Sequence, residues 1–291
     1  MNSLYRKRGV ISALLTSLLF LTLSGCGSIF PQVARATIAR PEQPILSPFQ
    51  PFRLVQVCLD TPPLFSAKYF REAASAIANK VDASVMPNQG GLAVFVSLIE
   101  HDSLQTNVLS ITVPALAADP QEPTLQVLPN PASYQSPYDY ADAVDKVKKA
   151  NGQLLNTWQA QLKSNHQQLT TIRAAVKQET TKLRSLPVPF DNTGADVYGC
   201  LDLASQHFHS IKAVKTLVIA SPLVNNTNSQ ETSTISLAGV SVKVIFHTCP
   251  QEVASVCLAN DARWKQSLLS FGVKDVSIFD PLQSETWHIT F

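Results

Sequence analysis

Short apolar runs alternate with segments of helical periodicity along most of this chain of 291 residues. The runs are Arg53–Leu59, Leu92–Ile99, Val108–Val113, Thr216–Ala220, Val240–Phe246 and Val276–Phe279. Most consist of valine, isoleucine and leucine almost throughout, which is typical of strands buried on both faces of a parallel sheet. Val108–Val113 is more polar and fits a strand at the sheet edge. We therefore expect an α/β fold with a doubly wound, mostly parallel sheet flanked by helices.

One region departs from this alternation. Residues 137–184 carry apolar side chains at steps of three and four, with Gly152 as the only internal helix breaker. This pattern predicts a long helical insertion in the α/β domain. A single helix would run for roughly 65–70 Å and project from the sheet, and its apolar stripe could serve as a coiled-coil surface. A break near Ser164-Asn165-His166 would instead give a helical hairpin, and the sequence leaves both alternatives open.

The N-terminus has the features of an export signal. Basic residues at positions 6–8 precede the apolar stretch Val10–Leu23, which ends in Leu-Ser-Gly-Cys at positions 23–26. The stretch is short for a membrane span, which needs about 20 residues. The ending resembles the lipobox of bacterial lipoproteins. That resemblance implies cleavage after Gly25 and a lipid, with acyl chains such as palmitate, that anchors Cys26 at the extracytoplasmic face of the cell membrane.

This interpretation divides the chain into a signal peptide at 1–25, a flexible tether at 26–51 and an α/β domain at 52–291, with 137–184 inserted in it. The tether is rich in Pro, Ser, Gln and Ala and lacks periodicity. The formal net charge is +2, and it becomes −1 without the three basic residues at 6–8. A near-neutral surface gives no reason to expect nucleic acid as a partner.

The cysteines give a second argument for export. Without Cys26, the chain has Cys58, Cys200, Cys249 and Cys257, which allow three pairings. The close spacing of Cys249 and Cys257 suggests a local bridge, and Cys58–Cys200 would then be the long-range one. A zinc site is the competing interpretation, but the chain has no CxxC pair and an oxidising compartment favours disulfides. We expect two disulfides.

The order of strands and loops resembles a von Willebrand factor A (VWA) domain. In that family a first strand ends in DxSxS, a later loop offers a Thr, and a later strand ends in Ser-Asp-Gly. Here the first strand ends in Asp60-Thr61-Pro62-Pro63-Leu64, Thr193 stands at the Thr position, and Ser221-Pro222-Leu223 follows the later strand. The resemblance covers about residues 53–280, interrupted by the helical insertion.

The resemblance implies a cation site, the metal-ion-dependent adhesion site, at the carboxyl end of the sheet. Magnesium needs a near-octahedral set of oxygen ligands. Pro62, Leu64 and Pro222 supply no side-chain oxygen, which leaves Asp60 and Thr193 as a remnant. We therefore expect no metal and no other cofactor, and Asp60 is expected to cap a helix or hold a loop. Ser66, Asp191 and Asp196 are nearby oxygen ligands that could compensate.

The sequence contains no GxSxG, HExxH or glycine-rich phosphate loop. We therefore expect a binding or scaffold module for protein interaction rather than an enzyme. The partner would bind over a face near Asp60, Thr193 and Ser221, or along the long helix. His207 and His209 are expected on a helix surface and not as ligands.

Two alternatives remain at this point. The chain could be a structural subunit of an envelope assembly that oligomerises through residues 137–184. It could also be an extracytoplasmic hydrolase whose site carries no recognised motif, which predicts a deep pocket with convergent polar groups.

Overall fold

The computed structural model describes residues 51–61, 66–105, 107–188, 194–209, 211–225, 235–245 and 254–279. The expected signal peptide, Cys26 and nearly all of the expected tether lie outside these residues. So do Thr193 and Cys249, and the side chain of Cys257 is not described either, so the expected Cys249–Cys257 bridge remains a prediction.

The described part of the chain contains a sheet of six strands with the order β3-β2-β1-β4-β5-β6. Their bounds are Arg53–Asp60 (β1), Leu92–Ile99 (β2), Asn107–Val113 (β3), Val214–Ala220 (β4), Ser241–Ile245 (β5) and Asp275–Ile278 (β6). All neighbouring strands are parallel except β2 and β3, which pair antiparallel at the edge. The mostly parallel α/β sheet is confirmed, and the more polar run lies at the edge as expected.

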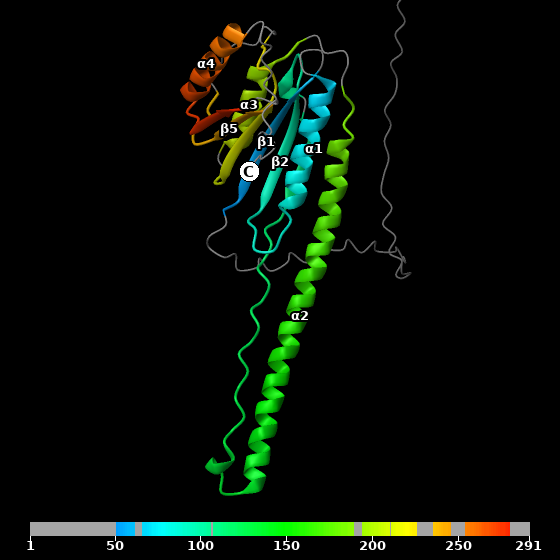
Figure 1. The fold of residues 1–291 in the computed structure, drawn as a ribbon, viewed down its shortest axis with the longest axis vertical. Helices are drawn as coiled ribbons and strands as arrows, with labels where there is room; N and C mark the ends of the chain where they lie inside the picture. Colours follow the sequence, from blue (N-terminus) through cyan, green and yellow to red (C-terminus); the bar gives the residue numbers. More distant parts are fainter. Residues whose placement is uncertain are drawn as a thin grey trace, which may run out of the picture. The chain divides into compact units, whose positions relative to one another are not determined.

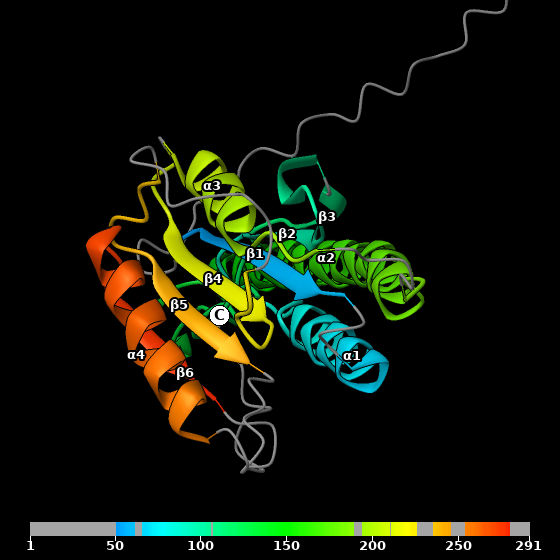
Figure 2. The same ribbon diagram turned by 90° about the horizontal axis from the view of Figure 1, so that it is seen from above.

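Helices cover both faces of the sheet (Figure 2). They are α1 (Ala67–Ala83), α2 (Pro137–Arg184), α3 (Val197–Phe208) and α4 (Ala254–Ser270). Alternate side chains of β1 point to opposite faces of the sheet and belong to two separate core clusters. Val55, Val57 and Leu59 pack with α1 and the end of α2, whereas Leu54 and Cys58 belong to the cluster of α3 and α4. The strand is therefore buried on both sides, which explains its nearly continuous apolar sequence.

The long insertion is one continuous helix of 48 residues (Figure 1). At 1.5 Å per residue, α2 is roughly 72 Å long. Ser136 caps its start by accepting a hydrogen bond from the Tyr138 N–H, and no break occurs near Asn165. The hairpin alternative is therefore not the observed structure. Within α2, only Val176, Thr180 and Leu183 are buried, so the helix joins the core through its last turns alone.

A disulfide joins Cys58 of β1 to Cys200 of α3. Both cysteines are fully buried, and their Cα atoms lie 6.4 Å apart. The bridge closes a sequence separation of 142 residues, which includes α1, β2, β3 and all of α2. It holds α3 on the central strand, and it is the long-range pairing that the sequence suggested.

Replacing both Cys58 and Cys200 by Ala should lower the free energy of unfolding by about 2–5 kcal/mol, because a bridge that closes a long loop restricts the unfolded chain. Urea denaturation monitored by circular dichroism measures this. Wild-type protein unfolded with a thiol reductant present should show at least the same loss, and any effect of the reductant on the double variant measures the expected Cys249–Cys257 bridge alone. Equal stability of wild type and variant would contradict a structural role for the bridge.

Candidate functional site

Asp60 and Ser221 meet at the carboxyl ends of β1 and β4. The Ser221 hydroxyl donates a hydrogen bond of 2.6 Å to Asp60 Oδ2, and the Thr61 backbone N–H donates one of 2.8 Å to Asp60 Oδ1. Asp60, Thr61 and Ser221 are all fully buried. In a parallel sheet this edge is where ligands usually bind, but the two side chains are oriented toward each other. Asp60 thus joins the end of β1 to the turn that follows β4.

The turn after β4 is fixed by the same serine. The Leu223 N–H donates to Ser221 Oγ at 2.9 Å, and the Trp264 indole N–H of α4 donates to the Leu223 carbonyl at 2.7 Å. Leu223 is fully buried and has a φ of 57°. This left-handed conformation is uncommon for a residue other than glycine. Burial of the leucine side chain and the two hydrogen bonds offset its cost.

The start of α3 is held by a second polar group. Asp196 caps the helix by accepting a hydrogen bond of 2.7 Å from the Gly199 N–H, and its backbone carbonyl accepts one of 2.7 Å from the Ser103 hydroxyl. A Cβ at Gly199 would overlap the Asp196 carboxylate, so a larger residue would displace the capping side chain. Asp196 and Ser66, named above as possible cation ligands, are therefore both helix caps, Ser66 at the start of α1.

Burial changes the acidity of the strand-end carboxyl. Desolvation raises the pKa of Asp60 to about 7, although the hydrogen bonds from Ser221 and Thr61 act in the opposite direction. Near neutral pH this carboxyl is therefore partly protonated. Within the described ranges, no cluster of three or more His, Cys, Asp or Glu side chains is placed to hold a metal ion.

His207 differs from its expected surface position. Its Nδ1 lies 2.7 Å from Gln56 Oε1, and its ring packs on Phe95 with the centroids 4.4 Å apart. Gln56 is fully buried in β1 and donates to the Ser97 hydroxyl at 2.9 Å. Burial lowers the pKa of His207. The sequence signal was the glutamine inside an otherwise apolar run, which needs a polar partner across the core.

The second candidate region is an arm formed by α2 and the segment that precedes it. We call residues 114–136 the strap. The strap runs antiparallel beside α2 (Figure 1), as three contacts show. Asn165 Nδ2 donates to the Ala118 carbonyl at 3.3 Å, the Trp158 indole N–H donates to the Pro120 carbonyl at 2.9 Å, and Asn151 pairs with Gln126. The last pair is reciprocal, because Gln126 N–H donates to Asn151 Oδ1 at 2.8 Å.

Asn151, Trp158 and Asn165 are spaced seven residues apart and so lie on one face of α2. The half-buried Leu155 and Leu162 fall between them. In a coiled coil this stripe would face a second helix. Here the strap lies along it, and side-chain amides and an indole bind the strap backbone. The strap therefore covers the stripe that the sequence analysis considered for oligomerisation.

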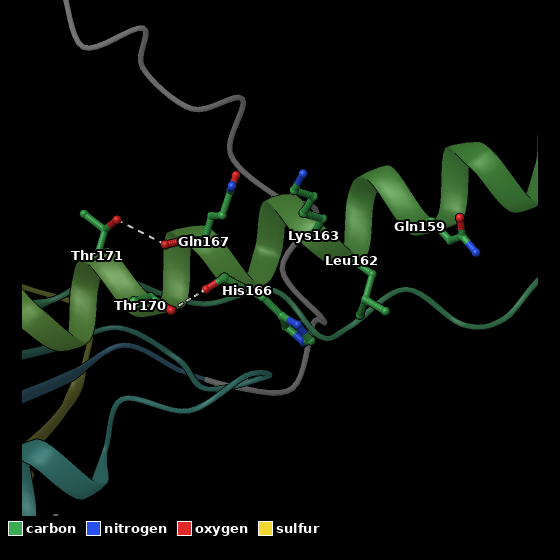
Figure 3. Close-up of a pocket in the computed structure, with 7 residues that line it drawn as sticks. All are labelled: Gln159, Leu162, Lys163, His166, Gln167, Thr170 and Thr171. Atoms are coloured by element: carbon green, nitrogen blue, oxygen red, sulfur yellow. Dashed lines mark hydrogen bonds between the residues drawn. The ribbon is translucent and has the colours of Figure 1, made fainter.

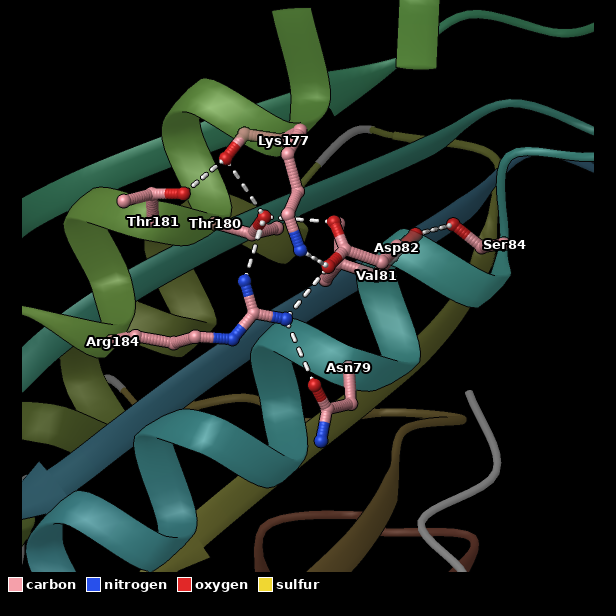
Figure 4. Close-up of polar contacts among 8 residues, drawn as sticks. All are labelled: Asn79, Val81, Asp82, Ser84, Lys177, Thr180, Thr181 and Arg184. Carbon is pink, nitrogen blue, oxygen red and sulfur yellow. Dashed lines mark hydrogen bonds and ion pairs between the residues drawn. The ribbon is translucent and has the colours of Figure 1, made fainter. Parts of the chain in front are cut away.

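A polar cluster fixes the other end of α2 to α1 (Figure 4). Asp82 accepts hydrogen bonds from Arg184 at 2.6 Å and from the Thr180 hydroxyl at 2.7 Å, and Lys177 Nζ lies 3.4 Å away. Arg184 also donates to Asn79 Oδ1 at 2.8 Å. Burial acts to raise the pKa of Asp82, but these hydrogen bonds and positive charges outweigh it, so the pKa lies below its ordinary value.

The far end of the arm exposes apolar side chains. Val127 is 89% exposed and Tyr138 86%, and Leu125, Leu128 and Tyr134 are exposed as well. We call these five residues the tip. Tyr134 and Tyr138 lie where the strap turns into α2, whereas Leu125, Val127 and Leu128 flank Gln126, which pairs with Asn151 about 20 Å farther along the helix. Contiguous exposed apolar residues commonly mark an interaction site, and Val127 and Leu128 are neighbours in the chain.

Two hollows lie along the arm. One is a volume of about 860 Å³ beside Gln159–Thr171 of α2. Figure 3 shows its lining side chains leaving the helix in different directions, Lys163 and Gln167 on one side and Leu162 and His166 on another, so they do not converge on a ligand. The other is a groove of about 430 Å³ between the strap and α2, beside Trp158.

Comparison with protein-family profiles, with curated proteins and with solved structures found no match for this chain. In the described residues, no helix combines the length and apolar character that crossing a membrane requires.

The structure brings together Asp60 and Ser221 of the expected face and buries both, and Thr193 lies outside the described residues. Sequence reasoning missed the strap, which has no periodic pattern.

Asp60→Asn should stabilise the protein at pH 8 by about 2–4 kcal/mol relative to wild type. The folded pKa of about 7 lies above the ordinary value of 3.8, so wild type loses stability as the pH rises through this window, and the amide removes that loss. Urea denaturation between pH 4 and pH 8 measures it, and the difference should shrink toward pH 4.

Asp82→Asn is the matched control, because the pKa of Asp82 is lowered instead of raised. Its folded-state carboxylate contributes stability at neutral pH that is lost on acidification, so this variant should be destabilised at pH 7 and approach wild type below pH 4. Equal effects of the two substitutions across the pH range would contradict the assignment for Asp60.

Proposed function

We propose that this protein is a lipid-anchored binding module that displays the arm outside the cell membrane and recognises a protein partner through it. The observation that carries the proposal is the contrast between the two candidate regions. Asp60 and Ser221 are fully buried and bonded to each other, whereas the tip exposes Val127 and Tyr138 almost completely. Exposed aromatic and aliphatic side chains are typical anchors of protein interfaces.

The α/β domain serves as the platform in this proposal, and its resemblance to a VWA domain has some further support. An antiparallel edge strand completes an otherwise parallel sheet, and Asp60 and Ser221 meet at the strand ends. Leu223, which stands where the family has Gly, adopts a φ of 57°, the conformation that favours glycine. In this proposal the platform works without a cation, because Pro62, Leu64 and Pro222 stand where the family has oxygen ligands.

Export and anchoring rest on the N-terminal sequence, and the Cys58–Cys200 bridge agrees with an oxidising compartment. A lipid on Cys26 and the tether would hold the domain near the bilayer. The alternative of oligomerisation through α2 has less support, because a second helix would have to displace the strap from Asn151, Trp158 and Asn165.

Excision of the outer arm tests the proposal. The hydrogen bond from Trp158 to the Pro120 carbonyl shows that these two residues lie close together. Residues 121–157 between them can therefore be removed and the cut ends joined by a short glycine-rich linker. The remaining α2 keeps Val176, Thr180, Leu183 and the Asp82 cluster. We expect the shortened protein to stay folded, with an unchanged near-ultraviolet circular dichroism spectrum of the domain, and to lose proteins that the full chain retains in pull-downs from the native envelope.

Cys26→Ser separates anchoring from binding in the same experiment. This variant should lack the mass of the lipid and stay uncleaved after Gly25, yet retain the partner in the pull-down. Identical partner recovery by the shortened arm and the full chain would contradict binding through the arm. Absence of a lipid mass on Cys26 of the wild-type protein would contradict the lipid anchor.

A further inference from the structure

The groove between the strap and α2 is lined by side chains without any charge. Its polar residues are Gln121 and Gln126 of the strap and Gln153, Thr157 and Gln161 of α2. Trp158 and smaller apolar groups complete the lining, and the volume of about 430 Å³ lies in the range of small-molecule sites. An exposed helix face is more commonly covered by charged residues, so this lining calls for an explanation.

From this chemistry we propose that the groove binds a neutral oligosaccharide. Glutamine amides supply a donor and an acceptor on the same side chain, which suits sugar hydroxyls that also do both. Trp158 offers an aromatic surface for the apolar C–H face of a sugar ring. A charged ligand would find no opposite charge in the lining, and a purely apolar one would leave four glutamine amides desolvated without partners.

The two walls of the groove are held in place before any ligand arrives. The Trp158 indole N–H is bound to the Pro120 carbonyl at 2.9 Å, which fixes the ring at the edge of the strap. The reciprocal pair between Asn151 and the backbone of Gln126 joins the walls farther along. Because the walls are joined at two points, their backbones need little rearrangement when a ligand enters, and the entropy cost falls mainly on the exposed glutamine side chains.

The groove adjoins Leu125 and Val127 of the tip, because Gln126 lines it. The inference goes beyond the proposed function because it needs neither the lipid anchor nor a protein partner. It does need the arm to be intact. A sugar polymer bound here would lie beside α2, between the α/β domain and the end of the arm at Tyr138.

Isothermal titration calorimetry with maltohexaose, cellohexaose and chitohexaose tests the proposal on residues 26–291 with Cys26→Ser, which lack both the apolar N-terminal stretch and the lipidation site. At least one of these neutral sugars should bind. The double variant Gln153→Ala, Gln161→Ala should weaken that binding by about tenfold or more, since alanine preserves the helix and removes two amides from the groove.

The matched control is Gln168→Ala, Gln178→Ala, which removes two exposed glutamines of α2 that do not line the groove. Its affinity should equal that of wild type. The proposal is overturned if no neutral sugar binds, if the groove variant binds as tightly as wild type, or if both glutamine pairs weaken binding equally. Preference for polygalacturonate or for a proline-rich peptide over the neutral sugars would also overturn it.

Discussion

The arm exists because most of α2 lies outside the core and the helix is attached to the α/β domain at one end. Only Val176, Thr180 and Leu183 of its 48 residues lie in the core, so most of the helix gains no stability from the α/β domain. The Asp82 cluster compensates at the end where the helix meets α1, because Arg184, Thr180 and Lys177 all converge on one carboxylate. Such half-exposed ion pairs are individually weak, but a network with neutral hydrogen bonds fixes the direction in which α2 leaves the domain.

Beyond that anchor, the strap takes the place of a second helix. Asn151, Trp158 and Asn165 bind its backbone at intervals of seven residues, so an extended proline-containing segment satisfies a stripe that otherwise suits a coiled coil. The arm can thereby stand away from the sheet and expose its tip. Within the α/β domain, Asp60 and Ser221 form a hydrogen bond with each other and stabilise the loops at the strand ends. In the proposed function, display by the arm and cohesion of the domain depend on different residues.

The sheet was predictable from sequence because its strands are buried on both faces and are therefore apolar throughout. The apolar pattern did not predict that Gln56 of β1 and His207 of α3 contact each other across the core, because a single polar pair changes no periodicity in the sequence. The motif at the strand ends located Asp60 and Ser221 but not their burial, which depends on the loops around them. The continuity of α2 could not be predicted, since a hairpin and a single helix need the same apolar stripe. The strap escaped prediction because its backbone, not its side chains, makes the principal contacts.

The most direct test of this account is a distance measured along α2. Spin labels at Gln153→Cys and Gln178→Cys, both exposed positions, would be separated by about 37 Å in a continuous helix, measured by double electron–electron resonance with a singly labelled chain as background. The account predicts one narrow distribution near that value. A population at about 10–20 Å, the spacing expected for packed antiparallel helices, would contradict a single anchored helix and with it the arm.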